Sequence, residues 1–286
     1  MVTIDGDVGN STYTEESEKV ERDHFFESYI AEQNMVGMAM VLAARGRIPL
    51  ASTFAFLTRA YGLARLAAIS RLNIKLAGTH VGVSIGEDGA SQMSLEDLAM
   101  FCTQPDFTVF YPSDATSVWK ATGMIAERKA PCYLRLGRPN AKILYPPEEI
   151  FEIGKLKVLR ESGQDKAVIV AGGVTLFEAL NAYEQLKSQG IVTCVIDLFS
   201  VRPIDQQGWI GAAQAAGKMI ITVENHYEHG GLGDAVASAV SSEPFRVFKL
   251  AVREIPRSGK PEELIEKFGI SASHIVATVK KAVSAS

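Results

Sequence analysis

The stretch Tyr29-Ile-Ala-Glu-Gln-Asn-Met35 places one carboxylate, Glu32, between a short apolar segment and a helix-forming run rich in glycine and alanine. Downstream stands Gly78-Thr-His-Val-Gly-Val-Ser-Ile-Gly-Glu-Asp-Gly-Ala-Ser-Gln-Met93, where the apolar run 74–77 gives way to a glycine-rich loop. His80 therefore follows a predicted strand. Open α/β sheets bind their ligands at the carboxyl ends of the strands. The two stretches together predict part of an active site at such an edge.

The composition is that of an ordinary globular protein. The 286 residues are 47% hydrophobic and 22% charged, which predicts one or two domains. A net charge of −4 and a pI near 5.8 give no reason to expect binding to nucleic acid or to an acidic membrane. No apolar run reaches the ~18 residues of a membrane span, and the N-terminus does not resemble a signal peptide. Three cysteines, Cys102, Cys132 and Cys194, lack metal-ligand spacing and are expected to be buried thiols in a reducing cytoplasm.

Apolar runs of strand length alternate with helix-length patterns, which predicts parallel α/β units. We expect two doubly wound α/β domains, residues 1–140 and 153–286, joined by a linker over 141–152. The linker is indicated by the prolines of Arg138-Pro-Asn and Tyr145-Pro-Pro, because proline removes a donor and disfavours helix before it. The predicted strands cover residues 2–4, 48–54, 74–77, 107–111, 132–136, 167–171, 192–196, 219–223 and 247–250. The predicted helices cover residues 31–45, 57–71, 94–101, 114–127, 172–186, 261–268 and 272–283.

Several helix ends carry residues that suit a cap. Helix ends leave backbone N–H and C=O groups without partners inside the helix. Gly46 is expected to close the helix over 31–45 in a left-handed conformation. Asp114 and the pair Ser94 and Asp97 are expected to cap the helices that begin beside them.

Each candidate residue has a structural explanation when it is considered alone. An acid at a helix start, such as Glu32, is favoured by the helix dipole. A Phe-x-Phe at a strand end, here Phe54 and Phe56, commonly belongs to a core. A histidine after a strand, such as His80, is commonly a hydrogen-bonded structural residue, and Arg138 before its proline is as often a solvated linker residue.

The segment Glu224-Asn-His-Tyr-Glu-His-Gly-Gly-Leu-Gly-Asp234 interleaves acids and histidines after a predicted strand. No further ligand cluster accompanies it, so we predict no metal site in this chain. Its glycine-rich turn opens a predicted helix and could bind an anion, but without an acidic partner in a βαβ unit the signal is weak. We expect a mainly structural role.

These motifs resemble the C-terminal half of transketolase, a thiamine diphosphate enzyme, and the resemblance runs from Asp5 to the C-terminus. Its most specific parts are the Glu32 segment, Gly86-Glu-Asp-Gly89 with Leu98-Ala-Met-Phe101, Tyr111-Pro-Ser-Asp114, and Pro256-Arg-Ser-Gly-Lys-Pro261. In that family another half, with a Gly-Asp-Gly segment and a later asparagine, holds magnesium and the diphosphate. No such segment occurs in this sequence. The resemblance therefore implies half of an active site.

The resemblance implies that Glu32 is the catalytic acid that activates the cofactor. A carboxylic acid within hydrogen-bond reach of the aminopyrimidine favours the imino tautomer, whose nitrogen removes the thiazolium C2 proton. Phe54 or Phe56 is implied to stack on the aminopyrimidine. Because this segment is one residue shorter than in many relatives, which of the two stacks stays open. His80 is implied to act in catalysis and to contact the sugar phosphate.

The resemblance also assigns residues to the substrate. Asp88 is implied to recognise a substrate hydroxyl. Gln92 stands where many relatives have histidine and animal-type enzymes have glutamine. Ser11 and Arg138 match positions that bind the terminal phosphate of the sugar, and the planar, bidentate donors of arginine suit a phosphate.

The implied activity is transfer of a two-carbon ketol unit between ketose and aldose sugar phosphates, in the pentose phosphate pathway. Thiamine diphosphate would lie between this chain and a separate N-terminal transketolase subunit, which would also bind Mg²⁺ or Ca²⁺, in an α2β2 heterotetramer. Two alternatives stay open: half of an enzyme like deoxyxylulose-5-phosphate synthase, and a non-catalytic fragment or paralogue that serves as a dimerisation or regulatory module. Beta subunits of 2-oxoacid dehydrogenases share the fold but match these motifs less well.

Overall fold

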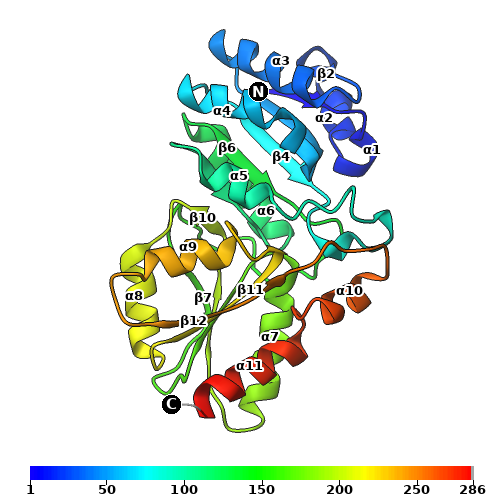
Figure 1. Ribbon diagram of the computed structural model, residues 1–286. Helices are drawn as coiled ribbons and strands as arrows, with labels where there is room; N and C mark the ends of the chain where they lie inside the picture. Colours follow the sequence, from blue (N-terminus) through cyan, green and yellow to red (C-terminus); the bar gives the residue numbers. More distant parts are fainter. Residues whose placement is uncertain (285–286) are drawn as a thin grey trace.

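Two β-sheets follow one another along the molecule, and the first is built mainly from the N-terminal half (Figure 1). The computed structural model describes residues 1–284, and the side chains of residues 56–58 lie outside that description. In spatial order, the first sheet consists of β10 (Ser200–Arg202), β5 (Thr108–Phe110), β6 (Cys132–Arg135), β4 (Lys75–Thr79), β3 (Pro49–Phe54), β1 (Val2–Asp5) and β2 (Phe25–Glu27). All neighbours in it are parallel except β10, which is antiparallel to β5.

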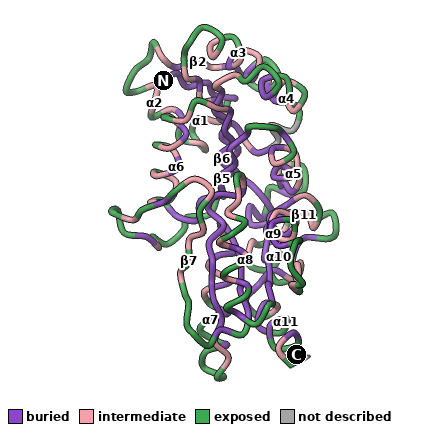
Figure 2. Tube along the Cα trace, turned by 90° about the vertical axis from the view of Figure 1, so that its left-hand side faces the viewer, coloured by how far each residue is buried: buried purple, intermediate pink, exposed green. Residues whose placement is uncertain are grey.

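The second sheet is also mainly parallel. In spatial order it consists of β12 (Arg246–Val252), β11 (Met219–Tyr227), β8 (Val168–Ala171), β9 (Cys194–Asp197) and β7 (Lys157–Arg160). Only β7, paired with β9, runs antiparallel among these described strands. Figure 2 shows buried chain along the middle of the molecule, where the inner strands of both sheets lie, whereas the edge strands β2, β7 and β12 are partly exposed.

Helices cover both faces of the first sheet. The helical segments of this half are α1 (Gly9–Thr12), α2 (Glu15–Val20), η1 (Arg22–His24), α3 (Glu32–Ala44), η2 (Ala55–Ala60), α4 (Tyr61–Ile69), η3 (Val83–Asp88), α5 (Asp97–Cys102) and α6 (Ala115–Glu127). Leu76 and Tyr133 of the sheet share one core with α3, α4 and α5. Ala77 and Leu134, the next residues along the same strands, share another core with α6. Successive strand residues point to opposite faces, so this half is doubly wound.

The second half repeats this arrangement. Its helices are α7 (Val174–Lys187), α8 (Gln206–Ala215), α9 (Leu232–Ala239), α10 (Pro261–Lys267) and α11 (Ala272–Ser284). Val168 and Val170 of the central strand face α8 and α9, whereas Ile169 and Ala171 face α7 and α11. The predicted fold class, two doubly wound α/β units, is confirmed. None of the helices within residues 1–284 is long and apolar enough to cross a membrane.

Two of the predicted helix ends are confirmed. Gly46 is left-handed at φ 80°, and the next N–H, that of Arg47, donates to the carbonyl of Leu42 at 3.0 Å. Asp114 caps α6 in a reciprocal capping box with Ser117. Such a pair satisfies two N–H groups that the helix itself leaves unpaired.

The predicted cap at Ser94 and Asp97 is wrong. The Asp97 carboxylate is fully buried and accepts instead from the Tyr133 hydroxyl at 2.7 Å and from Arg135 Nε at 2.8 Å. Leaving a buried arginine without a charged partner costs more free energy than leaving a helix end without a side-chain cap. The helix predicted over 57–71 begins only at Tyr61, after the 3₁₀ turn η2.

The predicted linker is mostly exposed, but two of its residues anchor it to the rest of the molecule. Tyr145 and Phe151 are buried in it. The backbone N–H of Tyr145 donates to Asp114 Oδ2 at 2.9 Å, and its hydroxyl donates to Asp197 Oδ2 at 2.7 Å. Segment 141–152 therefore ties the first sheet to the second. The exact domain boundaries stay a prediction.

Candidate functional site

Five neighbouring parallel strands of the first sheet, in the order β6-β4-β3-β1-β2, end at one edge. A predicted site residue lies at or after the carboxyl end of each strand. In the same order these residues are Arg138, His80, Phe54, Ser11 and Glu32. Strands in a sheet lie about 4.8 Å apart, so five strands span about 19 Å. The fold thus brings residues from distant parts of the sequence to one edge, where open α/β sheets bind ligands.

Glu32 is the first residue of α3 and is only 5% exposed. Its Oε1 is buried and has no hydrogen-bond partner among the described residues. The side chain lines a pocket of about 470 Å³ with Ile30, Ala31, Gln33, Asn34 and Arg59. An unpaired buried carboxyl oxygen is unfavourable unless a ligand or partner supplies a donor. Glu32 therefore borders a pocket, and one of its carboxyl oxygens is buried without a hydrogen-bond partner among the described residues.

The backbone at this edge of the sheet takes a conformation that side chains rarely adopt. Asp7, Tyr29 and His80, which follow β1, β2 and β4, are left-handed with φ of 61°, 55° and 60°. Left-handed residues other than glycine are uncommon, and strained backbone of this kind clusters at functional sites. Three such residues after three strands of one sheet therefore support the placement of the site.

Glu27, the last residue of β2, holds two of these left-handed turns. Its Oε1 accepts from the N–H of Asp7 at 3.1 Å and from the N–H of Tyr29 at 2.7 Å. Burial raises the pKa of Glu27, the two N–H groups oppose this shift, and the nearby Asp5 charge adds to it. Sequence reasoning missed this residue, because nothing in its local pattern marks it.

Phe54 and His80 lie in contact at the centre of the edge. Their ring centroids are 4.0 Å apart with the planes tilted by 37°. His80 is buried, and its Nδ1 lies 2.9 Å from the hydroxyl oxygen of Thr79. Burial lowers the pKa of His80, the Arg138 charge lowers it further, and Asp88 opposes them. The neutral imidazole is therefore favoured. Phe56, the other predicted stacking residue, lies outside the described side chains.

The loop after β4 meets the segment after β6. Arg138 Nη1 lies 3.1 Å from each carboxylate oxygen of Asp88 and 3.4 Å from the carbonyl oxygen of Ile85. Gln92, in the same loop, has a buried Oε1 without a hydrogen-bond partner among the described residues. Ser11 is exposed, and its hydroxyl donates to Asn10 Oδ1 at 3.2 Å. Arg138 and Asp88 were predicted to bind different parts of a substrate, and the structure pairs them with each other.

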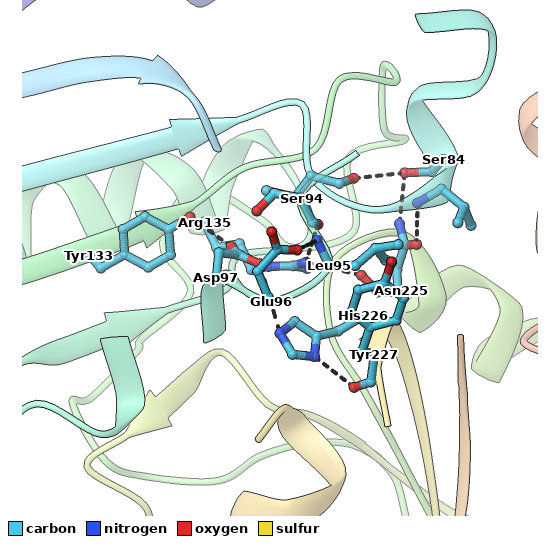
Figure 3. Close-up of polar contacts among 12 residues, drawn as sticks. Ser84, Ser94, Leu95, Glu96, Asp97, Tyr133, Arg135, Asn225, His226 and Tyr227 are labelled. Carbon is cyan, nitrogen blue, oxygen red and sulfur yellow. Dashed lines mark hydrogen bonds and ion pairs between the residues drawn. The ribbon is translucent and has the colours of Figure 1, made fainter. Parts of the chain in front are cut away.

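The segment Glu224-Asn-His lies at the junction of the two halves and is fully buried (Figure 3). His226 Nε2 lies 4.0 Å from Asp97 Oδ1, and burial lowers the pKa of this imidazole to about 4. The Asn225 carbonyl accepts from Arg135 Nη2 at 3.0 Å. No group of three His, Cys, Asp or Glu side chains in the described part of the chain could hold a metal ion. These contacts support the structural role predicted for the segment.

Among the three thiols, burial outweighs the nearby positive charges at Cys102 and at Cys132, where Lys75 Nζ lies 3.6 Å from Cys132 Sγ. Cys132 and Cys194 are buried and Cys102 is half-buried. Burial raises the pKa of Cys102 and of Cys194 to about 12 and also raises the pKa of Cys132. The thiolate is the reactive form of cysteine, so burial disfavours the reactive form at each of them.

Comparison with known proteins gives the family. Residues 1–143 match the model described as transketolase, pyrimidine binding domain, and residues 154–275 match transketolase, C-terminal domain. Transketolase-like protein 2 of Mus musculus is 52% identical over 286 residues, which are 99% of this chain and 46% of the relative. Transketolase of Homo sapiens is 48% identical over 283 residues, which are 98% of this chain and 45% of the relative. The chain thus spans about half the length of these relatives.

Solved structures agree with this assignment. A chain described as split gene transketolase, inactive beta4 tetramer, superposes with a TM-score of 0.91 at 38% identity, over 99% of this chain and 92% of that chain. Transketolase from Campylobacter jejuni subsp. jejuni shares the fold, with a TM-score of 0.84 at 23% identity, over 98% of this chain and 43% of its own. The two family models together cover most of the sequence. The chain therefore belongs to the transketolase family and corresponds to its C-terminal half, with the pyrimidine-binding domain followed by the C-terminal domain.

Proposed function

We propose that this chain is the C-terminal subunit of a split transketolase. It transfers a two-carbon ketol unit between sugar phosphates, together with a separate N-terminal subunit that carries the diphosphate-binding domain. The observation that carries the proposal is Glu32, a buried acid that borders a pocket of about 470 Å³ and has one carboxyl oxygen without a partner among the described residues. A half site is expected to leave such a group without a donor until the rest of the site is present.

The residues at the sheet edge suit thiamine diphosphate. Glu32 Oε1 would share a proton with the aminopyrimidine ring, and Phe54 would offer its ring face to it. When bound, the cofactor supplies carbanion chemistry that no side chain provides. No metal-binding group occurs in the described residues of this chain. The partner subunit would therefore hold the diphosphate and its Mg²⁺ or Ca²⁺.

The remaining site residues would hold the sugar phosphate. Arg138 has donors beyond the one nitrogen that contacts Asp88, and these would bind a terminal phosphate with help from the Ser11 hydroxyl. Asp88 and the free Gln92 Oε1 would accept hydrogen bonds from sugar hydroxyls. His80, favoured in its neutral form, would donate or accept a proton at the reacting carbonyl.

A second subunit is supported by what this chain contains and by one of its structural relatives. The solved chain of similar length is described as a split gene transketolase in an inactive beta4 tetramer. By analogy, this chain would self-associate and gain activity only with its N-terminal partner, as an α2β2 heterotetramer. The diphosphate half would then complete the pocket beside Glu32.

A mixing experiment tests the proposal. The purified chain is assayed with fructose 6-phosphate as donor and ribose 5-phosphate as acceptor, with thiamine diphosphate and Mg²⁺, alone and after addition of the N-terminal subunit. We expect turnover only in the mixture. Turnover by this chain alone would refute the split site. No turnover in a mixture that forms a stable complex would refute the activity and favour a regulatory module.

A further inference from the structure

The loop of residues 82–95, which carries Asp88 and Gln92, packs into the core of the other half of the molecule. It leaves the first sheet after β4, yet its apolar side chains share a cluster with α7, α10, α11 and the second sheet. These side chains are Val83, Ile85, Met93 and Leu95. Helix α10 lies directly against η3, the central part of the loop (Figure 1). The C-terminal domain therefore determines the shape of a loop that belongs to the pyrimidine-binding domain.

Asn225 makes the polar part of this attachment (Figure 3). Its Oδ1 accepts from the N–H of Val83 at 2.8 Å, and its Nδ2 donates to Ser84 Oγ at 2.9 Å. Its own carbonyl accepts from Arg135 at the end of β6, three residues before Arg138. One fully buried residue, Asn225, therefore contacts both chain segments that carry the Asp88–Arg138 pair: the loop through its side chain and the end of β6 through its backbone carbonyl.

Two glycines show how closely the C-terminal domain approaches. Gly82 has φ 73°, and a Cβ there would lie 2.2 Å from Asn225 Cγ. Gly86 has φ 76°, and a Cβ there would lie 2.9 Å from Pro261 Cδ. Only glycine tolerates such a backbone without strain. At both glycines the loop backbone is therefore in close contact with the C-terminal domain.

We propose that Asn225 is a positioning residue for substrate recognition, through which the C-terminal domain holds Asp88 and Arg138 in place. Arg138 also donates to the carbonyl of Ile85 within this loop, so a shift of the loop moves both members of the pair. The statement about substrate rests on the proposed function. The attachment of the loop can be tested without it.

The first test measures hydrogen exchange of peptides from residues 82–95 in the purified chain. Asn225→Ala removes both side-chain bonds to the loop, and we expect exchange there to rise about tenfold, because each lost buried bond raises the population of the opened loop. Ser84→Ala removes one of the bonds and should raise exchange in the same peptides by less.

Thr175→Val is the matched control. Its buried hydroxyl lies 2.9 Å from the carbonyl oxygens of Gly172 and of Val223, both within the C-terminal domain, and its one proton is shared between them. The variant therefore also loses buried hydrogen bonding, but none to the loop. Exchange of residues 82–95 should stay unchanged in it. If Asn225→Ala leaves that exchange unchanged, or if Thr175→Val raises it equally, the proposal is overturned.

The second test uses the complex with the N-terminal subunit. Asn225→Ala should raise KM for fructose 6-phosphate about tenfold and leave kcat within about twofold, the pattern of lost substrate binding. Thr175→Val should leave KM unchanged. A looser loop with an unchanged KM would refute the positioning role. An inactive wild-type complex would instead refute the proposed function, and the exchange experiment would still decide whether Asn225 holds the loop.

Discussion

Arg138 donates from a single nitrogen, Nη1, to both carboxylate oxygens of Asp88 at 3.1 Å each. The two side chains are 48% and 32% exposed. Solvent screens so exposed a pair, and such pairs contribute little to stability. The contact is therefore easily rearranged, and it keeps the guanidinium at the sheet edge with its other nitrogens available to a second anion.

Arg138→Gln should weaken binding of phosphorylated sugars specifically. A charge-assisted, bidentate contact to phosphate is among the stronger hydrogen bonds in proteins. Hydrogen bonds to charged groups contribute about 1.5–3 kcal/mol, so we expect KM for fructose 6-phosphate to rise about 10- to 100-fold. The measurement is kcat and KM with fructose 6-phosphate and with unphosphorylated fructose. Arg253→Gln, which removes a similar exposed pair with Glu228 in the C-terminal domain, is the control and should change neither. An equal loss with both sugars would contradict phosphate recognition by Arg138.

Glu32→Gln should nearly abolish turnover in the assembled enzyme. The substitution keeps the size of the side chain and removes the acid, and loss of a positioned general acid commonly costs a factor of about 10²–10⁴. Exchange of the thiazolium C2 proton of bound thiamine diphosphate, followed by NMR, checks the step directly. Glu127 is an exposed acid at the end of α6. The Glu127→Gln enzyme is the control, and the C2 proton should exchange in it at the wild-type rate. C2 exchange at the wild-type rate in Glu32→Gln would remove Glu32 from its assigned role.

Asp97→Ala should destabilise the fold strongly. Arg135 and Asp97 are fully buried, and removing one partner leaves an uncompensated charge, which costs about 3–5 kcal/mol. The double variant Asp97→Ala/Arg135→Met should recover part of that loss, because it leaves no buried charge. Urea unfolding measures both. A cost for Asp97→Ala no larger than that for the exposed-pair variant Arg253→Gln would contradict this account.

Glu224 should make stability depend on pH. Burial raises its pKa from 4.5 to about 8, so the folded chain binds more protons than the unfolded chain between these values. The contribution of Glu224 to the free energy of unfolding is then highest below pH 4.5 and falls as pH rises to 8, by a total on the order of 5 kcal/mol. Glu224→Gln should remove this dependence and gain stability relative to the wild type between pH 5 and pH 8 in thermal unfolding.

Asp234→Asn supplies the matched control for that measurement. Burial raises the pKa of Asp234, but hydrogen bonds from Lys249 and from the Gly230 N–H outweigh burial and lower this pKa below 3.8. Asp234 is therefore ionised at both pH 5 and pH 8, but its charge also raises the pKa of Glu224, so its removal should reduce the pH dependence only in part. A Glu224→Gln variant that leaves the pH dependence unchanged would show that Glu224 does not titrate in this range.

Much of the fold could be predicted because buried parallel strands read as continuous apolar runs. The runs before His80 and at Phe54 are of this kind, and the parallel order then brings their carboxyl ends together. Strands β2, β7 and β10 were missed because they lie at the edges of the sheets and lack a continuous apolar run. The equally short β5 lies inside its sheet and was predicted from such a run.

Residue contacts across the molecule could not be predicted in the same way. Asp97 carries the local pattern of a helix cap, and only the fold brings Arg135 against it. Asn225 lies in a segment whose interleaved acids and histidines draw attention to a metal, whereas its contacts lie in a loop about 140 residues earlier. Local pattern predicts elements, and long-range partners depend on how these elements pack.

Strand β10, residues Ser200–Arg202, joins the first sheet although it follows strands of the second in the sequence. The chain thus returns to the first sheet after entering the second. The hydrogen bonds between β10 and β5 hold the two halves together in addition to the peptide bonds between them. If the connection at 141–152 were cleaved, the pairing of β10 with β5 would still join the two halves. Either half would have to break this pairing before it could rotate or diffuse away. A hinge at residues 141–152 alone would therefore not separate the two halves, because β10 must also leave the first sheet.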